Sequence, residues 1–426
     1  MSLDKSQNDW GWIKAKDFML FNPKESIKKG TVVKNVPMDK IEPKTKEIPS
    51  YELTEYKGGV KFRNGDILMA RITPCLENGK ISQVSILDYN EIGAGSTEFI
   101  VLREKEGISD KDFIYYLSNS EYFKEPAIKS MVGSSGRQRV QRDVVENLEI
   151  YVPPLETQKK IGKVLSFFDK KISLNKKINK NLQKQINILF KSFFINFEFY
   201  DGKYQETLFG EIPIEWNIIL FKDILNERNE KSTNQDIPMY SVTLDGIQPR
   251  ADIYKKKITA KTTKFKIIHK YDLIFGMPNS GYQYGIMYDE IGGVSSAYPV
   301  FEINGIQPRY VDLFIKNISN YFNDIVKSGS RMGQGIDKKV LLSKEIYVPP
   351  NEHLDKYYSI ESKLLDLINH NLTEINNLTK LRDTLLPKLM SGEIDVSKIN
   401  CDLELKYNYM KYLFNQIHTP MSKSVV

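Results

Sequence analysis

Cysteine is almost absent from this chain. Only Cys75 and Cys401 occur among 426 residues, and they form no CxxC pair. This scarcity argues against a disulfide framework and against a thiolate zinc site, and it fits a reducing compartment. Histidine is also scarce. The four histidines are His269, His353, His370 and His418. None of them lies in a metal-binding pattern such as HExxH.

Long apolar runs and catalytic motifs are missing as well. No run approaches the ~20 apolar residues that span a bilayer, and the opening MSLDKSQNDW has no signal-peptide core. The chain contains neither GxxxxGK[ST] nor a GxGxxG after a predicted strand, and its acidic residues are scattered rather than clustered for a metal. The sequence therefore predicts a soluble, cytoplasmic protein that is not an enzyme and holds no cofactor or metal.

What the chain does contain is typical of a globular protein. Hydrophobic residues make up 41% and charged residues 27%, with 24 Tyr and 21 Phe. The length exceeds the roughly 150 residues of one ordinary domain, so we expect at least two domains. The net charge of +7 permits a polyanionic partner, although this excess is mild for 426 residues.

The chain repeats itself. The segment EIYVPP occurs at residues 149–154 and again 196 residues later at 345–350, and each copy leads into a helical pattern. Apolar residues then recur at three- and four-residue spacing in matching places, which predicts an apolar seam on both helices. The seam residues are Ile161, Phe168, Ile172, Leu182, Leu189 and Phe193 in the first copy, and Tyr357, Leu364, Ile368, Leu378, Leu385 and Leu389 in the second.

The helices are expected within residues 154–200 and 349–396, each ~60 Å long at 1.5 Å per residue. A single helix cannot bury such a seam alone, so we expect the two to form an antiparallel coiled coil. Asn175 and Asn371 interrupt the seam at matching places. They either form a buried pair that fixes the register or face solvent. Pro387 predicts that the second helix kinks or ends there.

The two globular parts are predicted over residues 1–153 and 201–348. Short β-branched and aromatic runs broken by Gly, Asn and Pro, such as QVSILDY, TEFIVL and YPVFEI, are typical of strands with turns. Trp10 precedes Asp17 by the same distance as Trp216 precedes Asp223. The fold class is therefore α+β, with two pseudo-symmetric domains. Residues 397–426 form a tail that we leave unassigned.

Three segments carry a resemblance to a known family. They are VPPLETQKKIGKVLSFFDKKI at 152–172, LRDTLLPKLMSGEIDV at 381–396 and GEIPIEWNIILFKDI at 210–224. The chain resembles the specificity subunits of Type I restriction-modification systems, from about residue 10 to residue 396. One departure is that the second copy reads PPNEHLDKYY, so Gln158 has no counterpart there and the two junctions need not be equivalent.

The resemblance implies a division of labour. Each domain would be a target-recognition domain that reads one half of a split, asymmetric sequence in double-stranded DNA. The helix pair would act as a spacer and dock two methylation subunits, and restriction subunits would join that core. The methyl donor, ATP and Mg would then belong to these partner subunits.

The candidate DNA-reading residues lie in loops that combine Gly with Arg, Gln, Asn or Ser, which can approach and pair with base edges. The first pair of loops, GSSGRQRVQR and GSRMGQGIDKK, precedes the two EIYVPP segments. Its candidates are Arg137, Gln138, Arg139, Arg142, Arg331, Gln334 and Lys338, the last as a phosphate contact. The second pair offers Arg71, Asn78, Lys80, Asn279, Ser280, Tyr282 and Gln283. Ordinary solvent-facing turns would look the same.

Two other functions stay open at this point. A coiled-coil scaffold that does not bind DNA is favoured if the Arg and Gln loops prove buried or tied into intramolecular salt bridges. A self-sufficient DNA methyltransferase or nuclease is favoured if the isolated chain binds a methyl donor or a metal.

Overall fold

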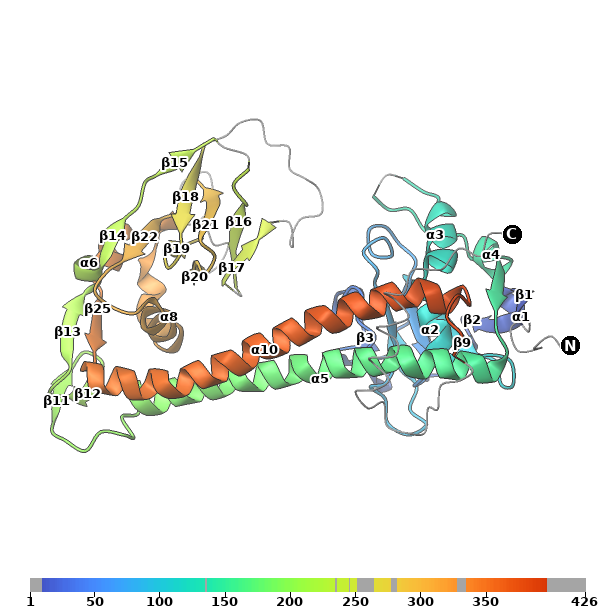
Figure 1. Ribbon diagram of the computed structural model, residues 1–426, viewed down its shortest axis with the longest axis horizontal. Helices are drawn as coiled ribbons and strands as arrows, with labels where there is room; N and C mark the ends of the chain where they lie inside the picture. The colour runs from blue at the N-terminus through green and yellow to red at the C-terminus, as the bar shows by residue number, and fades with distance from the viewer. Residues whose placement is uncertain are drawn as a thin grey trace, which may run out of the picture. The chain divides into compact units, whose positions relative to one another are not determined.

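The structure is a computed structural model. It describes residues 10–134, 136–233, 236–244, 246–250, 264–276, 282–327 and 335–396. The chain divides into two compact units: unit 1 comprises Met1–Lys180 with Ile368–Val426, and unit 2 comprises Asn181–Leu367. Two 40-residue helices, α5 (Leu155–Phe194) and α10 (Asn351–Met390), contribute to both units (Figure 1).

Unit 1 is built on two four-stranded sheets. Its elements are β1 (Gly11–Lys14), α1 (Ala15–Phe18), β2 (Met19–Phe21), β3 (Val32–Val36), η1 (Met38–Lys40), β4 (Glu52–Glu55), β5 (Val60–Phe62), β6 (Ile67–Ala70), β7 (Ile81–Gln83), β8 (Gly93–Gly95), β9 (Phe99–Glu104), α2 (Lys111–Asn119), α3 (Glu121–Lys129), α4 (Arg142–Glu146) and β10 (Glu149–Val152). The sheets have the strand orders β2-β9-β6-β7 and β4-β3-β8-β5, and β1 pairs with β10 in a separate ribbon.

The central strands of the first sheet are buried on both faces. Along β9, Ile100 and Leu102 join the core that includes the long helices, whereas Phe99 and Val101 join a second core with residues of β3 and β5. Successive side chains of a strand point to opposite faces, so a strand between two apolar layers must be apolar throughout. This explains why the run FIVL carries no polar residue.

Unit 2 repeats part of this plan, because its described residues form one four-stranded and one three-stranded sheet. Its elements are β11 (Tyr204–Thr207), β12 (Gly210–Pro213), β13 (Asn217–Leu220), α6 (Phe221–Ile224), β14 (Leu225–Glu227), β15 (Lys231–Ser232), β16 (Tyr240–Thr243), β17 (Gly246–Pro249), β18 (Phe265–His269), β19 (Leu273–Phe275), β20 (Tyr284–Ile286), β21 (Ile291–Ser295), β22 (Val300–Ile303), α8 (Pro308–Asn317), η2 (Ser319–Ile325), β23 (Val326–Lys327), β24 (Gly335–Ile336), α9 (Lys338–Leu342) and β25 (Glu345–Val348). The sheet β14-β22-β19-β20 has the order of β2-β9-β6-β7 in unit 1, and the ribbon β13-β25 matches β1-β10.

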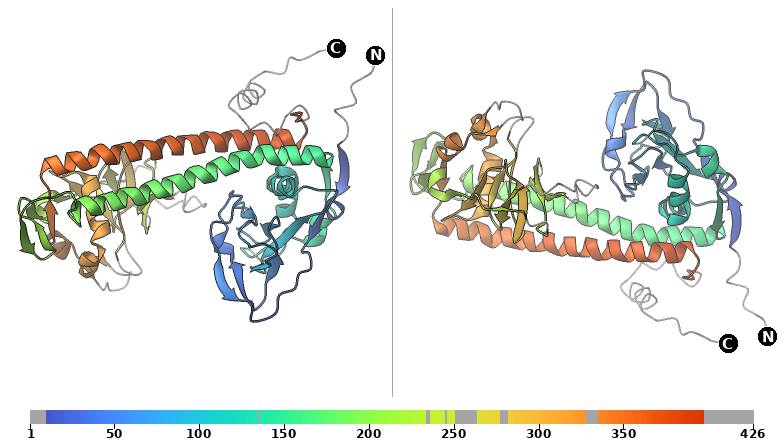
Figure 2. Two further views of the ribbon diagram at one scale, coloured as in Figure 1. Left: turned by 90° about the horizontal axis from the view of Figure 1, so that it is seen from below. Right: turned by 90° about the horizontal axis from the view of Figure 1, so that it is seen from above.

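Helices α5 and α10 lie side by side and run antiparallel within each unit (Figures 1 and 2). In unit 1, Asp169 contacts Arg382 and Asn179 contacts Asn371, so the residue number falls along α10 as it rises along α5. In unit 2, Phe190 and Phe193 of α5 pack on Tyr357 of α10. The α+β class and the antiparallel long helices are therefore confirmed. Helix α10 does not end at Pro387, because it continues to Met390.

The two junctions between a domain and its long helix differ, as the sequence indicated. Gln158 is 2% exposed, accepts a hydrogen bond from the amide of Asp110 at 3.0 Å and donates to the carbonyl of Pro153 at 2.8 Å. It thereby joins α5 to the start of α2. The position 196 residues later holds Leu354, a buried apolar side chain, so the second junction is made by packing instead.

A buried ion pair ties the helices of unit 1 to its domain. Arg382 Nη1 of α10 donates to Asp169 Oδ1 of α5 at 2.5 Å, and the hydroxyl of Tyr116 on α2 donates to Asp169 Oδ2 at 2.5 Å. The side chains of Arg382 and Asp169 are 11% and 8% exposed. Burial, and next the Asp169 carboxylate, raises the pKa of Tyr116 well above its usual value, so this phenol stays a donor.

We predict that Arg382→Met lowers the free energy of unfolding by about 3 kcal/mol, because it leaves the Asp169 carboxylate buried without its counter-charge. Urea titration of the full chain measures this loss. Adding Asp169→Asn removes the uncompensated charge and should recover much of the stability. The matched control is Lys388→Met on the same helix, because the partly exposed pair of Lys388 with Glu393 should contribute under ~1 kcal/mol. Equal losses from Arg382→Met and Lys388→Met would contradict the prediction.

Candidate nucleic-acid interface

The two candidate loops of the first copy lie together at one end of the sheet in unit 1. Strand β6 ends at Ala70, which faces Phe99 at the start of β9. The next residue, Arg71, accepts a backbone hydrogen bond from the amide of Val140 at 2.8 Å. Thr73 and Gln138 bond twice, from the Thr73 amide to the Gln138 carbonyl and from the Gln138 amide to Thr73 Oγ1, each at 3.0 Å. Backbone contacts therefore join segments almost seventy residues apart in the sequence.

The loop around Arg137 is a short hairpin. Val132 and Arg139 exchange backbone hydrogen bonds of 3.1 and 2.9 Å at its base. Gly133 and Gly136 have φ values of 137° and 81°, which L-residues with a side chain rarely adopt. A Cβ on Gly133 would also lie 2.9 Å from the carbonyl oxygen of Arg137. The glycines are thus required by the turn itself, whatever the tip contacts.

Arg137 stands at the exposed tip of this hairpin. Its backbone amide donates to the carbonyl of Ser134 at 2.9 Å, and its guanidinium makes no hydrogen bond or ion pair with a described residue. Among the candidate arginines in the described part of the chain, Arg137 is the one left unpaired. An exposed, unpaired guanidinium on a fixed hairpin is available to bind an anion or the acceptor edge of guanine.

The neighbouring arginines are engaged within the chain. Arg139 makes a bidentate ion pair with Glu98, with Nη2 at 2.6 Å from Oε1 and Nε at 3.0 Å from both carboxylate oxygens. Hydrogen bonding from Arg139 lowers the pKa of Glu98, and Glu98 raises that of Arg139. Arg142 Nε pairs with Glu146 at 2.5 Å, one turn along α4. Gln138 is half-buried beneath the tip.

The candidate loop of residues 71–80 has fewer side chains available for binding than its sequence indicated. Lys80 Nζ donates to the carbonyl of Met38 at 2.8 Å. Arg71 is half-buried, with Nη2 at 3.3 Å from the carbonyl of Val140 and its Nε buried without a hydrogen-bond partner. Asn78 is half-buried in the turn that leads to Lys80. Arg71 and Lys80 therefore hold the loop in place.

The second copy is described only in part. Asn279, Ser280, Arg331 and Gln334 lie outside the described residues. Tyr282 is half-buried, its hydroxyl donates to the carbonyl of Ser319 at 3.0 Å, and burial raises its pKa to about 12. Gln283 is half-buried next to β20, and its carbonyl accepts a hydrogen bond from Gly276. Lys338, the first residue of α9, pairs with Glu227.

Most of the predicted seam is buried. Buried residues are Ile161, Phe168, Ile172, Leu182, Phe193, Tyr357, Ile368, Leu378, Leu385 and Leu389, and half-buried ones are Leu189 and Leu364. In unit 1 these positions share one core with the domain, because Ile161, Phe168 and Leu385 cluster with residues of β6 and α2. The seam therefore holds the domain as well as the opposite helix.

The two seam asparagines do not pair with each other. Asn175 is 2% exposed and donates to Glu374 Oε2 at 2.7 Å. Asn371 donates to Asn179 Oδ1 at 2.8 Å, and Asn179 donates to the carbonyl of Ile368 at 3.3 Å. Because the helices are antiparallel, Asn371 faces a residue one turn beyond Asn175. The expected pair is replaced by two separate polar contacts, and neither asparagine is left to solvent alone.

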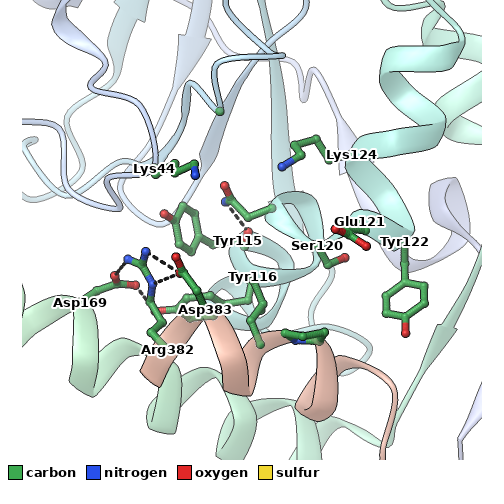
Figure 3. A pocket seen from close by; sticks show the side chains of 14 residues that line it. Lys44, Tyr115, Tyr116, Ser120, Glu121, Tyr122, Lys124, Asp169, Arg382 and Asp383 are labelled. Atoms are coloured by element: carbon green, nitrogen blue, oxygen red, sulfur yellow. Dashed lines mark hydrogen bonds and ion pairs between the residues drawn. The ribbon is translucent and has the colours of Figure 1, made fainter. Parts of the chain in front are cut away.

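A pocket of about 320 Å³ lies in unit 1 between α2, the start of α3 and the end of α10 (Figure 3). The Asp169–Arg382 pair forms one wall, Tyr115 and Tyr116 form another, and Lys44 and Lys124 stand at the rim (Figure 3). The Arg382 guanidinium is already bonded to Asp169 and Asp383, so its charge is compensated within the chain. We therefore assign Asp169, Arg382 and Asp383 a structural role.

The described part of the chain contains neither a metal-binding group nor a membrane-spanning helix. Within residues 10–396, leaving aside the undescribed stretches, no group of three or more His, Cys, Asp or Glu side chains could hold a metal ion. Over the same residues, no helix combines the length and apolarity needed to cross a membrane.

The chain is similar in sequence to known specificity subunits of Type I restriction enzymes. Residues 7–184 match the family model of the Type I restriction modification DNA specificity domain. The MjaIX specificity subunit of Methanocaldococcus jannaschii is 28% identical over 319 residues, which cover 69% of this chain and 71% of that protein. The EcoAI specificity subunit of Escherichia coli is 34% identical over 157 residues, covering 36% and 26%. The crystal structure of a Type-I restriction-modification S subunit from M. genitalium aligns with TM-score 0.48 at 16% identity, covering 91% and 98%.

We predict that Arg137→Ala and Glu98→Gln change the affinity for a polyanion in opposite directions. Arg137→Ala removes the unpaired charge and should lower the salt concentration that elutes the chain from heparin, whereas Glu98→Gln releases Arg139 and should raise it. Lys159→Ala on α5 removes the same charge away from the loops and serves as the control. A shift for Lys159→Ala as large as that for Arg137→Ala would show that net charge alone decides binding.

Proposed function

We propose that this chain, which belongs to the family of Type I restriction-modification specificity subunits, recognises a DNA sequence for partner subunits that carry out the chemistry. The observation that carries the proposal is the hairpin of unit 1. Its tip presents Arg137 unpaired, while its base is fixed by backbone bonds to the end of the sheet. Recognition of base edges needs such a side chain on a rigid support.

The presence of two similar domains supports recognition of a DNA target in two halves. The sheet β14-β22-β19-β20 of unit 2 has the strand order of β2-β9-β6-β7 in unit 1, and the ribbon β13-β25 matches β1-β10. The residues of the loops that precede the two EIYVPP segments differ between the copies, from GSSGRQRVQR to GSRMGQGIDKK. We infer an asymmetric target whose halves are separated by unread base pairs. Arg137 would read one half, and Arg331 with Gln334 would read the other.

The two long helices would set the separation of the half-sites and provide the docking surface for two methylation subunits. Both helices are 40 residues long and run antiparallel within each unit. Restriction subunits would join this core. The methyl donor, ATP and Mg would be bound by those partners, and the assembly would act in the cytoplasm. This chain would contribute recognition and no catalytic group.

One set of observations favours the alternative of a scaffold that does not bind DNA. Arg139 pairs with Glu98 and Lys338 with Glu227, and Lys80 is bonded to a backbone carbonyl. Intramolecular pairs of this kind reduce the positive charge available to phosphates. The unpaired Arg137 and the fixed hairpin weigh against the scaffold. A direct binding measurement decides between the two.

We predict that Arg137→Ala costs ~1–3 kcal/mol of binding free energy and relaxes discrimination at one base pair of one half-site. Binding of the complex with its methylation partner to a library of singly substituted targets, at two salt concentrations, measures both effects. Arg142→Ala removes the same charge from a neighbouring candidate that is paired with Glu146 and bonded to the carbonyl of Phe21, and its loss should be smaller than that of Arg137→Ala. An equal loss of affinity for all sequences would mean that Arg137 binds phosphate. No loss of affinity would favour the scaffold.

We predict that four alanines inserted after Asn179 disturb the pairing of α5 with α10, because the insertion shifts the seam and displaces the contact with Asn371. Assembly with the methylation subunit and the spacing of methylated positions should both change. An insertion of the same length after the exposed Tyr89 is the control. If the Asn179 insertion left assembly and spacing as they were, the helix pair would not be the spacer.

A further inference from the structure

In unit 2, the segment that follows α5 covers the aromatic face of the β13-β25 ribbon. The ring of Phe197 lies 5.1 Å from that of Trp216, and the ring of Phe209 lies 5.1 Å from that of Tyr347, centroid to centroid. The hydroxyl of Tyr347 donates to the carbonyl of Phe194 at 2.8 Å. Trp216 and Tyr347 are each only 2% exposed as a result.

The same ribbon in unit 1 has an uncovered aromatic face among the described residues. The register is identical, because Trp12 faces Tyr151 as Ile218 faces Tyr347. Tyr151 stacks between Trp10 and Trp12 at centroid distances of 5.3 and 5.2 Å. Yet Tyr151 is 38% exposed and Trp12 is 70% exposed. Large exposed aromatic side chains that adjoin one another mark a surface that another segment or molecule covers.

A pocket of about 310 Å³ lies in this face where unit 2 places a phenyl ring. It is lined by Leu117, Tyr122 and Tyr151, together with Trp12 and Met390. In unit 2, the ring of Phe209 packs on Phe314 of α8, on Tyr321 of η2 and on Tyr347. Leu117 and Phe314 hold the same place in their helices, seven residues after the N-cap. The unit 1 pocket is therefore the counterpart of the Phe209 site.

The chain leaves both long helices in the same way. After α5, the amides of Ile195 and Glu198 bond to the carbonyls of Lys191 and Ser192 at 2.9 and 2.8 Å. After α10, the amides of Ser391 and Ile394 bond to the carbonyls of Pro387 and Lys388 at 3.0 and 3.2 Å. These residues are 196 apart throughout. The chain also passes directly beside the ribbon, because a Cβ on Gly392 would lie 3.3 Å from the ring of Trp10.

We propose that residues 397–426 bind back onto the aromatic face of unit 1 and that one of their apolar side chains fills the pocket, as Phe209 does in unit 2. These residues follow α10 as the covering segment follows α5. Their sequence contains an apolar stripe at four- and three-residue spacing, the pattern of an amphipathic helix. The stripe consists of Leu403, Tyr407, Met410, Phe414 and Ile417. Residues 1–9, MSLDKSQND, contain only two apolar side chains, Met1 and Leu3, and therefore no comparable stripe.

Site-specific photo-crosslinking of the full chain tests this proposal. Benzoylphenylalanine replaces Tyr122, which is 55% exposed at the rim of the pocket, and in a control it replaces Tyr89, which is 94% exposed elsewhere in unit 1. The Tyr122 probe should crosslink to a peptide within residues 397–426, and the Tyr89 probe should not. A mixture of isotopically heavy and light chains shows whether the crosslink joins one chain or two. We expect it within one chain.

A second pair of variants separates a specific fit from mere proximity. Tyr407→Ser with Phe414→Ser removes two stripe residues and should abolish the Tyr122 crosslink. Tyr409→Ser with Tyr412→Ser removes two aromatic rings off the stripe and should leave it intact. The proposal is overturned by a crosslink between two chains, by a crosslink to residues 1–9, by the absence of any crosslink, or by equal yields from the two double variants.

Discussion

The structure depends on one requirement: an amphipathic helix of 40 residues cannot leave its apolar seam in water. Each long helix meets this requirement twice, against the other helix and against a domain. In unit 1, Phe168 and Leu385 belong to the same core as the strands of the domain. The domain is therefore built onto the helix pair rather than attached by a linker. The buried Asp169–Arg382 ion pair adds specificity to this apolar contact. Two charges that are excluded from water must lie against each other, so the pair favours one alignment of α5 with α10.

The internal repeat explains why so much of the fold was predictable from one sequence. The 196-residue offset placed both helices, and the repeated EIYVPP segments placed the strands that end each domain. Of the two outcomes expected at Pro387, the end of the helix is wrong, because α10 continues to Met390. The kink stays a prediction. The asparagines were also misjudged. In an antiparallel pair, matching positions of the two copies face each other only if the helices are aligned at those positions. The sequence alone does not fix this alignment.

Side-chain chemistry in the loops was harder to predict than their location. The sequence identified the 71–80 and 133–142 loops as candidates, but it did not indicate that they lie side by side. Arg71, Lys80, Arg139 and Arg142 also look the same in a sequence whether they are free or paired. Glu98 lies about forty residues from Arg139, and only the sheet brings them together. The residues of the buried ion pair, Asp169 and Arg382, were missed, although both lie in the segments that carried the family resemblance. Their placement in those motifs was the available signal.

The way the hairpin is anchored has a consequence for how such a protein changes over generations. Its base is held by main-chain amides and carbonyls of Arg71, Val132, Gln138, Arg139 and Val140. Main-chain bonds survive replacement of a side chain, and the exposed tip contributes nothing to either core. Mutations at the tip are thus almost free of cost to folding, while mutations at Gly133 or Gly136 are not. A lineage could alter what its hairpin contacts by single substitutions at the tip, with the surrounding fold unchanged.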